Sequence, residues 1–205
     1  MEDSQQILEV KQKANTWRAE MWDFIKTVLI FAVIYFIIKT YIAQPFLVKG
    51  RSMEQTFSDG DYLIVDELSY RFREPHRFEV IVFHTEFIPG GAQREYYIKR
   101  VIGLPGDRVV IKDGTVILYE NNGAIPTELD EAYITDGIKT ISPEPIDIIV
   151  EPNKYFVLGD NRGNSSDSRS WGLLDKSYIV GKPAVRLFPF NAITVFSKER
   201  FIESN

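Results

Sequence analysis

The chain of 205 residues contains no cysteine, which excludes disulfide bridges, thiolate metal ligands and a cysteine nucleophile. Its two histidines, His76 and His84, are too few for a histidine metal site, and no HExxH or comparable ligand spacing occurs. A Ser-His-Asp triad is disfavoured, because His76 follows a proline and His84 ends an apolar run. We therefore expect no metal or other cofactor, and chemistry that relies on the remaining oxygen and nitrogen groups.

Basic residues are in the minority, since 24 Lys and Arg stand against 29 Asp and Glu, for a formal charge of −5. A protein that binds nucleic acid through its phosphates needs a basic surface, so we expect no nucleic-acid partner. Hydrophobic residues make up 44% of the chain, which is enough to build a core and disfavours disorder. Charges within residues 1–45 cancel, so the negative charge belongs to residues 46–205.

The most apolar stretch runs from Met21 to Val48, although charged residues interrupt it. A membrane-spanning helix needs about 20 residues, and residues 24–44 supply 21 if Lys26 and Lys39 extend toward the headgroups. We interpret residues 23–45 as an uncleaved transmembrane anchor. The alternatives are a buried helix of a soluble protein and a cleaved signal peptide, but the latter lacks a suitable small-residue cleavage site.

Basic residues around this stretch favour a cytoplasmic N-terminus by a small margin. Before or at the start of the predicted span stand Lys11, Lys13, Arg18 and Lys26, and at its end or beyond it stand Lys39, Lys49 and Arg51. We therefore expect residues 1–22 in the cytoplasm and residues 46–205 outside it, held at the cell membrane by a single pass.

After the predicted anchor, short apolar runs alternate with Gly, Pro, Asp and Asn, which is typical of antiparallel β structure. No helical pattern recurs between the runs, so a parallel sheet is disfavoured. Lys112-Asp113-Gly114 predicts a hairpin, and a loop-rich inserted lobe is expected at about residues 112–153. The fold class is therefore mainly β. The candidate strands are residues 46–48, 62–65, 80–83, 96–102, 108–111, 115–119, 155–158, 179–180, 184–188 and 193–196.

Three segments have residues that are unusual in a part of the chain that only builds the fold. Ser52 lies in Gly-Arg-Ser-Met just beyond the apolar stretch, Lys99 lies in a predicted strand on the same face as Tyr97, and residues 159–169 are small and polar. Singly, they have ordinary explanations: a surface serine, a lysine at a strand edge and a solvated loop. Together they favour catalysis, because a serine nucleophile without a usable histidine needs another base. A lysine serves when burial lowers its pKa.

The order of these segments resembles bacterial type I signal peptidase, from the apolar stretch to at least Gly172. The matching motifs are Gly-x-Ser-Met, Tyr-Ile-Lys-Arg-Val-Ile-Gly-Leu-Pro-Gly-Asp and Gly-Asp-Asn-Arg-x-x-Ser-x-Asp-Ser-Arg. The resemblance implies an antiparallel β catalytic core and a membrane-anchored serine endopeptidase. Such an enzyme removes signal peptides from exported preproteins after small residues, in an Ala-x-Ala-like pattern. The implied partners are these preproteins, membrane lipid and the protein export machinery.

The same resemblance implies roles for individual residues. Ser52 would attack the scissile carbonyl and Lys99 would act as the neutral general base. The backbone N–H of Ser52 would contribute to the oxyanion hole, and Ser165 would hold the Lys99 amine. Asp167 and Arg169 would brace their loop through a salt bridge.

The chain departs from the family pattern at three positions. Gly50 stands where some members carry a serine that helps to bind the oxyanion, Gln55 stands where a proline is usual, and Phe78 replaces a glycine. The changes at Gln55 and Phe78 keep open an alternative function, a non-catalytic membrane-tethered β domain that binds exported peptides. A peptidase that cleaves only itself is a third hypothesis, which the predicted anchor disfavours.

Overall fold

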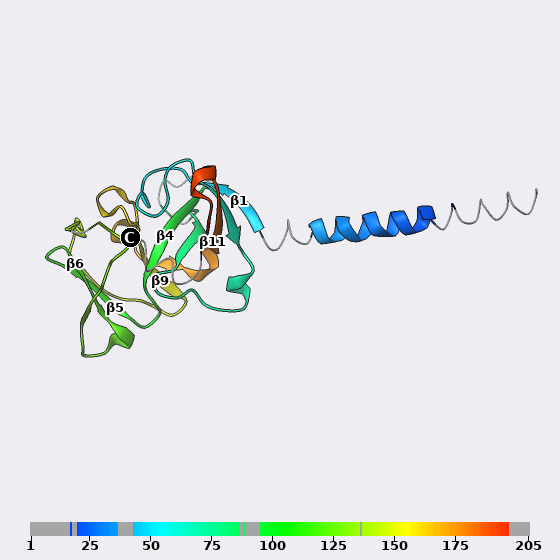
Figure 1. The fold of residues 1–205 in the computed structure, drawn as a ribbon. Coiled ribbons are helices and arrows are strands. Elements are labelled where there is room, and N and C mark those ends of the chain that lie inside the picture. The colour runs from blue at the N-terminus through cyan, green and yellow to red at the C-terminus, as the bar shows by residue number, and fades with distance from the viewer. Residues whose placement is uncertain are drawn as a thin grey trace, which may run out of the picture. The chain divides into compact units, whose positions relative to one another are not determined.

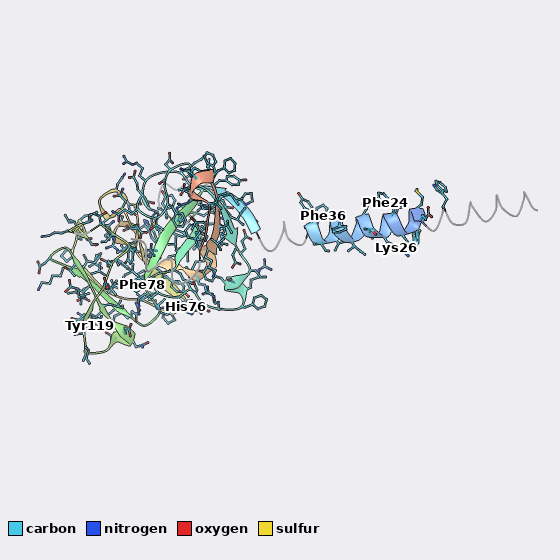
Figure 2. All side chains as sticks on the ribbon, in the orientation of Figure 1. Phe24, Lys26, Phe36, His76, Phe78 and Tyr119 are labelled. Carbon is cyan, nitrogen blue, oxygen red and sulfur yellow. The ribbon has the colours of Figure 1, made fainter. Side chains whose placement is uncertain are left out.

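The computed structural model describes residues 17, 20–36, 43–86, 88, 95–135 and 137–196. It divides the chain into two units, Met1–Ile42 and Ala43–Asn205. In the first unit, residues 20–36 form a helix, drawn in blue in Figure 1. Figure 2 shows Phe24, Lys26 and Phe36 projecting from it.

Among the residues that the structure describes, no helix is both long and apolar enough to cross a membrane. The predicted span continues into residues 37–42, which lie outside the described part of the chain. The predicted anchor reached Pro45, but Ala43, Gln44 and Pro45 belong to a strand and pair with Asp66, Val65 and Ile64. A proline is tolerated there because the strand lies at the edge of its sheet.

The second unit contains a large sheet, drawn in Figure 1, in which the paired strands of the described residues run antiparallel. The strand order is β1-β2-β11-β3-β4-β9-β10, and β12 pairs with β11. The mainly antiparallel β fold predicted from the sequence is confirmed. The strands are β1 (Ala43–Leu47), β2 (Tyr62–Asp66), β3 (Val80–His84), β4 (Tyr96–Gly103), β9 (Lys154–Leu158), β10 (Leu174–Asp175), β11 (Ile179–Phe188) and β12 (Thr194–Val195).

A second, antiparallel sheet has the order β7-β6-β5-β8, and we call residues 108–149 the lobe. The predicted hairpin is present: Lys112 pairs with Thr115, and Asp113 and Gly114 have φ angles of 55° and 91°. A two-residue turn of this kind requires positive φ at both positions. The strands are β5 (Arg108–Lys112), β6 (Thr115–Tyr119), β7 (Thr127–Glu128) and β8 (Ile146–Ile149).

Helical segments of the second unit are short and connect the strands. They are η1 (Ser69–Arg71), η2 (Glu120–Asn122), η3 (Arg162–Asn164), α2 (Ser168–Trp171), η4 (Lys176–Tyr178) and η5 (Phe190–Ala192).

The strand prediction was wrong in two respects. It missed β7, β8 and β10, and it divided β11 into two runs at residues 181–183. Gly181 and Pro183 do not end β11. The strand continues through them, with bulges in its pairing with β2 and with β3. A Cβ atom at Gly181 would lie 2.4 Å from the carbonyl oxygen of Asp66, so the glycine allows β2 to approach β11 closely.

Three apolar clusters form the core of the second unit. One includes Ile81, Val101 and Val157 of the large sheet. Another contains Met53 and Phe57, which follow Ser52 in the chain. The third contains residues of the lobe together with residues of β4 and β9, so the two sheets share a core: Ile102, Val109, Ile111, Val116, Leu118, Tyr133, Ile134, Val150, Phe156 and Leu158. The lobe is therefore packed against the large sheet.

Candidate active site

Ser52 begins a compact turn between β1 and β2. Met53 and Phe57 are buried, and the amides of Thr56 and Phe57 donate to the Met53 carbonyl at 2.8 and 2.7 Å. Because the residue that follows Ser52 is held in the core, the serine is fixed at the rim of the domain. This explains why a buried apolar residue directly follows the candidate nucleophile.

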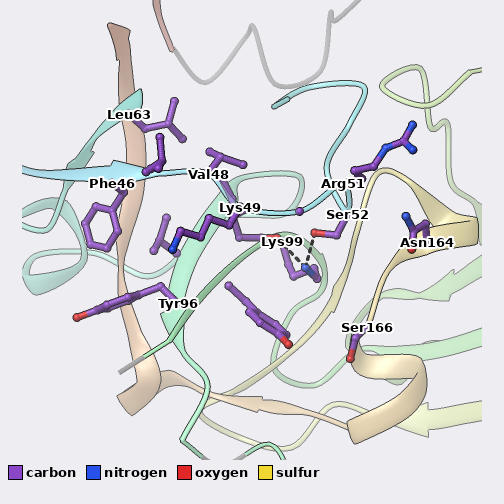
Figure 3. Close-up of a pocket in the computed structure, with 15 residues that line it drawn as sticks. Phe46, Val48, Lys49, Arg51, Ser52, Leu63, Tyr96, Lys99, Asn164 and Ser166 are labelled. Atoms are coloured by element: carbon purple, nitrogen blue, oxygen red, sulfur yellow. Dashed lines mark hydrogen bonds between the residues drawn. The ribbon is translucent and has the colours of Figure 1, made fainter. Parts of the chain in front are cut away.

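Lys99 reaches Ser52 from β4. Its Nζ atom lies 2.7 Å from Ser52 Oγ and 3.0 Å from the carbonyl oxygen of Ile98, which accepts a hydrogen bond from it (Figure 3). The lysine is only 2% exposed, and its Nζ lies 4.9 Å from the centre of the Tyr97 ring. The predicted burial of Lys99, and its place on the same strand face as Tyr97, are thereby confirmed.

Burial lowers the pKa of Lys99 from 10.5 to about 8. The carboxylates of Asp167 and Asp160 oppose this change by favouring the ammonium form, whereas the charge of Arg169 adds to it. A lysine with a pKa near 8 is neutral in about a tenth of molecules at pH 7, whereas a lysine with its ordinary pKa is almost never neutral there. The site can therefore supply an amine that accepts a proton from the serine hydroxyl.

Asp167 and Arg169 form the predicted ion pair. The buried carboxylate of Asp167 accepts hydrogen bonds from Nε and Nη2 of Arg169, each at 2.8 Å. It also accepts one from the backbone N–H of Gly159 at 3.0 Å. The ion pair therefore fixes both ends of the segment that contains Ser165.

Ser165 lies at the site without the hydrogen bond expected of it. Its buried Oγ has no hydrogen-bond partner in the described part of the chain, so the predicted bond to Lys99 is not formed. The amine instead contacts Ser52 and the Ile98 carbonyl. A Cβ atom at Gly159 would lie 2.2 Å from Ser165 Oγ and 2.5 Å from the Ser52 carbonyl oxygen, so only glycine fits between them.

Gly50 provides no hydroxyl for an oxyanion. Its φ is 89°, its N–H donates to Asp59 Oδ1 at 2.7 Å, and a Cβ atom there would meet nothing within 4 Å. A side chain at this position would have space but would strain the backbone. The glycine at residue 50 is therefore physically consistent with the turn, since it adopts the positive φ without strain.

Sequence reasoning missed a residue that holds the Ser52 backbone. The N–H of Asn161 donates to the Ser52 carbonyl at 3.0 Å, and its side-chain amide donates to the Arg51 carbonyl at 3.0 Å. Asn161 lies within the third motif, but neither its spacing nor its residue type indicates this partner.

A buried ion pair also escaped prediction. Asp160 accepts hydrogen bonds from Nε and Nη2 of Arg100 at 2.8 and 2.7 Å, and both side chains are at most 1% exposed. Thr56 Oγ1 donates to the same carboxylate at 2.5 Å. The pair therefore joins β4, the turn after Ser52 and the loop after β9. The sequence feature that could have indicated this pair is Arg100 itself, a charged residue in the middle of an apolar strand.

A cleft of about 210 Å³ opens beside Ser52 and Lys99 (Figure 3). Residues 46–52 line it, whereas Val82 alone lines it from β3. The lining residues are Phe46, Leu47, Val48, Lys49, Gly50, Arg51, Ser52, Leu63, Val82, Tyr96, Tyr97, Ile98, Lys99, Asn164 and Ser166.

The family model described as signal peptidase, peptidase S26, matches residues 21–188. This chain belongs to that family. The resemblance inferred from the three motifs is confirmed. As a member of the family, the chain is a signal peptidase, and its substrates are preproteins that carry signal peptides.

Individual relatives agree with this family. Signal peptidase IB of Staphylococcus aureus is 33% identical over 189 residues, which cover 85% of this chain and 93% of the relative. Probable signal peptidase I-2 of Synechocystis sp. is 35% identical over 188 residues, which cover 89% and 81%. The crystal structure of a signal peptidase I from Enterococcus faecalis V583 is 28% identical, covers 54% of this chain and 97% of its own, and has a TM-score of 0.40.

Proposed function

We propose that Ser52 and Lys99 form the catalytic dyad of a membrane-anchored serine endopeptidase that cleaves preproteins after small residues, in an Ala-x-Ala-like pattern. The observation that carries this proposal is the 2.7 Å contact between the buried Lys99 Nζ and Ser52 Oγ beside an open cleft. A nucleophile and a base within hydrogen-bond distance are the geometric requirement for covalent catalysis.

The reaction follows from this contact. Neutral Lys99 takes the Ser52 proton while Oγ attacks the scissile carbonyl, and the resulting ammonium protonates the leaving amine as the C–N bond breaks. Water then attacks the acyl-enzyme and gives a proton to Lys99. Lys99 passes this proton to Ser52 Oγ as the bond between Oγ and the acyl carbon breaks, which regenerates the serine. The Ser52 N–H is the proposed oxyanion donor, and one such donor lowers the barrier by about 3–4 kcal/mol.

The cleft supports an extended peptide as substrate. Most of its lining comes from the edge strand β1, from the segment that follows β1, and from β4. An extended peptide that binds along strands places alternate side chains in pockets. The cleft volume of about 210 Å³ leaves room for several residues of such a peptide beside Ser52.

The wider setting belongs to the same proposal. Residues 23–42 anchor the chain in the cell membrane, residues 1–22 stay in the cytoplasm and the catalytic domain lies outside it. Membrane lipid and the export machinery then bring preproteins to the cleft. The binding-only alternative rested on Gln55 and Phe78, and neither side chain takes part in the contacts of the Lys99 amine with Ser52 and Ile98.

Cleavage of a defined substrate tests this function. The full chain in lipid vesicles is expected to cut a preprotein after the second alanine of an Ala-x-Ala site, as shown by mass spectrometry of the products. A matched preprotein with phenylalanine at that position should react at least about 100-fold more slowly, because the proposed specificity is for a small side chain there. Stable binding of the signal peptide without any cleavage would instead support the non-catalytic alternative.

The pH dependence of cleavage tests the lysine base. Since Lys99 accepts a proton only when neutral, kcat should be low at pH 6, rise through the pKa of about 8 and level off at higher pH. Single-turnover rates at saturating substrate measure this step without a contribution from binding. A flat profile between pH 6 and 10, with chemistry rate-limiting, would exclude Lys99 as the base.

A further inference from the structure

Residues 131–135 of the lobe contact each part of the chain that forms the candidate site. This lobe segment lies between β7 and β8, outside the three motifs that predicted the function. Its contacts reach the loop after β9, the turn after Ser52 and the strand that carries Lys99. Such a distribution of contacts is more than attachment of the lobe requires.

The first contact links Glu131 to the loop after β9. Arg162 is buried, and its Nη1 donates to Glu131 Oε2 at 2.8 Å while its Nη2 donates to Glu131 Oε1. Nε of the same guanidinium donates to the Gly159 carbonyl at 3.1 Å. Gly159 is the residue whose backbone packs against the Ser52 carbonyl. Glu131 therefore acts on the nucleophile through Arg162 and Gly159.

The second contact links Thr135 to the turn after Ser52. The backbone N–H of Thr135 donates to Gln55 Oε1 at 2.8 Å. Gln55 stands where a proline is usual, and a glutamine does not restrict the backbone as proline does. In this chain a hydrogen bond to the lobe restrains the turn at that position.

The third contact lies between these two. The Tyr133 ring packs against the Arg100 guanidinium, with Cζ 4.0 Å from the ring centre, and Arg100 directly follows Lys99 in β4. The Tyr133 hydroxyl donates to Glu131 Oε1 at 2.7 Å. The Glu131 carboxylate thus orders both Tyr133 and Arg162, which lies in the loop after β9.

We propose that Glu131 is a positioning residue that, through Arg162, holds Ser52 and Lys99 in line, with the Gln55 hydrogen bond as a second restraint from the same lobe segment. This inference rests on the proposed dyad. It gives the lobe a part in catalysis, because a displacement of about 1 Å at a reacting group is enough to slow a reaction about 100-fold.

Glu131→Gln tests the proposal, with Glu128→Gln on the exposed strand β7 as the matched control. We expect kcat to fall about 10-fold with KM within about twofold of the unmodified protein. We also expect the Lys99 pKa to rise by about half a unit or more, as loosening of the site admits water to the amine. NMR of ¹³Cε-labelled lysine measures this pKa, and Lys99→Met assigns the signal. Gln55→Ala, an exposed substitution, should lower kcat several-fold in the same way.

The NMR readout separates this proposal from the proposed function, because it does not require turnover. If the unmodified protein cuts no preprotein but Glu131→Gln still raises the Lys99 pKa, the peptidase proposal fails and the positioning role stands. If Glu131→Gln and Gln55→Ala leave both kcat and the Lys99 pKa unchanged, the positioning role is overturned, even where the melting temperature falls.

Discussion

Replacing Ser52 by alanine, or Lys99 by methionine, is expected to lower kcat for signal-peptide cleavage by about 10⁴-fold or more. Nucleophile and base act as one unit, so loss of either removes nearly the whole contribution of the pair. Methionine has a similar length and fills the buried space without an amine. Because burial disfavours the ammonium form of Lys99, we expect the melting temperature of Lys99→Met to be unchanged or higher.

Kinetics and thermal unfolding of the same preparations measure both effects. Lys112→Met is the control, since Lys112 is exposed at the end of β5 and should leave cleavage unchanged. A folded Lys99→Met protein that still cleaves at more than a tenth of the normal rate would mean that another group accepts the serine proton.

Asp160→Ala is expected to lower the free energy of unfolding by about 3–5 kcal/mol. The substitution leaves the fully buried Arg100 without its carboxylate, and an uncompensated buried charge is strongly destabilising. The loss should also reduce activity, because the neighbouring Asn161 N–H holds the Ser52 carbonyl. Urea unfolding followed by fluorescence measures the stability change.

Asp147→Ala is the matched control for that experiment. Its ion pair with Arg108 is equally short but exposed to water, and pairs of that kind contribute little to stability. Replacing both buried partners, as in Arg100→Met with Asp160→Leu, should recover much of the lost stability, since no unpaired charge remains. A single Asp160→Ala variant as stable as the unmodified domain would show that water reaches Arg100.

The sequence predicted those parts of the molecule that depend on local patterns. Short apolar runs bounded by Gly, Pro, Asp and Asn identified most strands of the large sheet. Asp113-Gly114 identified the hairpin because its backbone angles require such residues. Ser52 and Lys99 were chosen on chemical grounds, and the structure brings them into contact. Tyr97 and Lys99 share a face because side chains alternate along a strand.

The unpredicted parts depend on contacts between segments far apart in the sequence. β8 was missed because its exposed and half-buried residues resemble a loop until β5 pairs with it. The hydrogen bond between Gln55 and Thr135 has no local pattern that could reveal it. Ser165 was assigned a bond to Lys99 from family resemblance, whereas its place against Gly159 follows from backbone packing alone.

Phe78 shows how an apparent defect in a motif can be compensated. It has a φ of 68°, a value that favours glycine, and glycine is usual at this position. Its ring packs 5.7 Å from that of Tyr133 in the lobe, centre to centre. The backbone strain of the substitution is therefore offset by apolar contact with the lobe, which the motif alone does not reveal.

The position of β11 has a consequence for the order in which the site is completed during synthesis. In the described sheet, β1 and β2, which flank the Ser52 turn, are joined to β3 and β4 through β11. β11 is made of residues 179–188, long after Ser52 and Lys99 have been synthesised. A nascent chain that ends before β11 lacks the strand that aligns the two halves. Completion of the candidate site is thus delayed until residues 179–188 have been synthesised and can pair with β2 and β3.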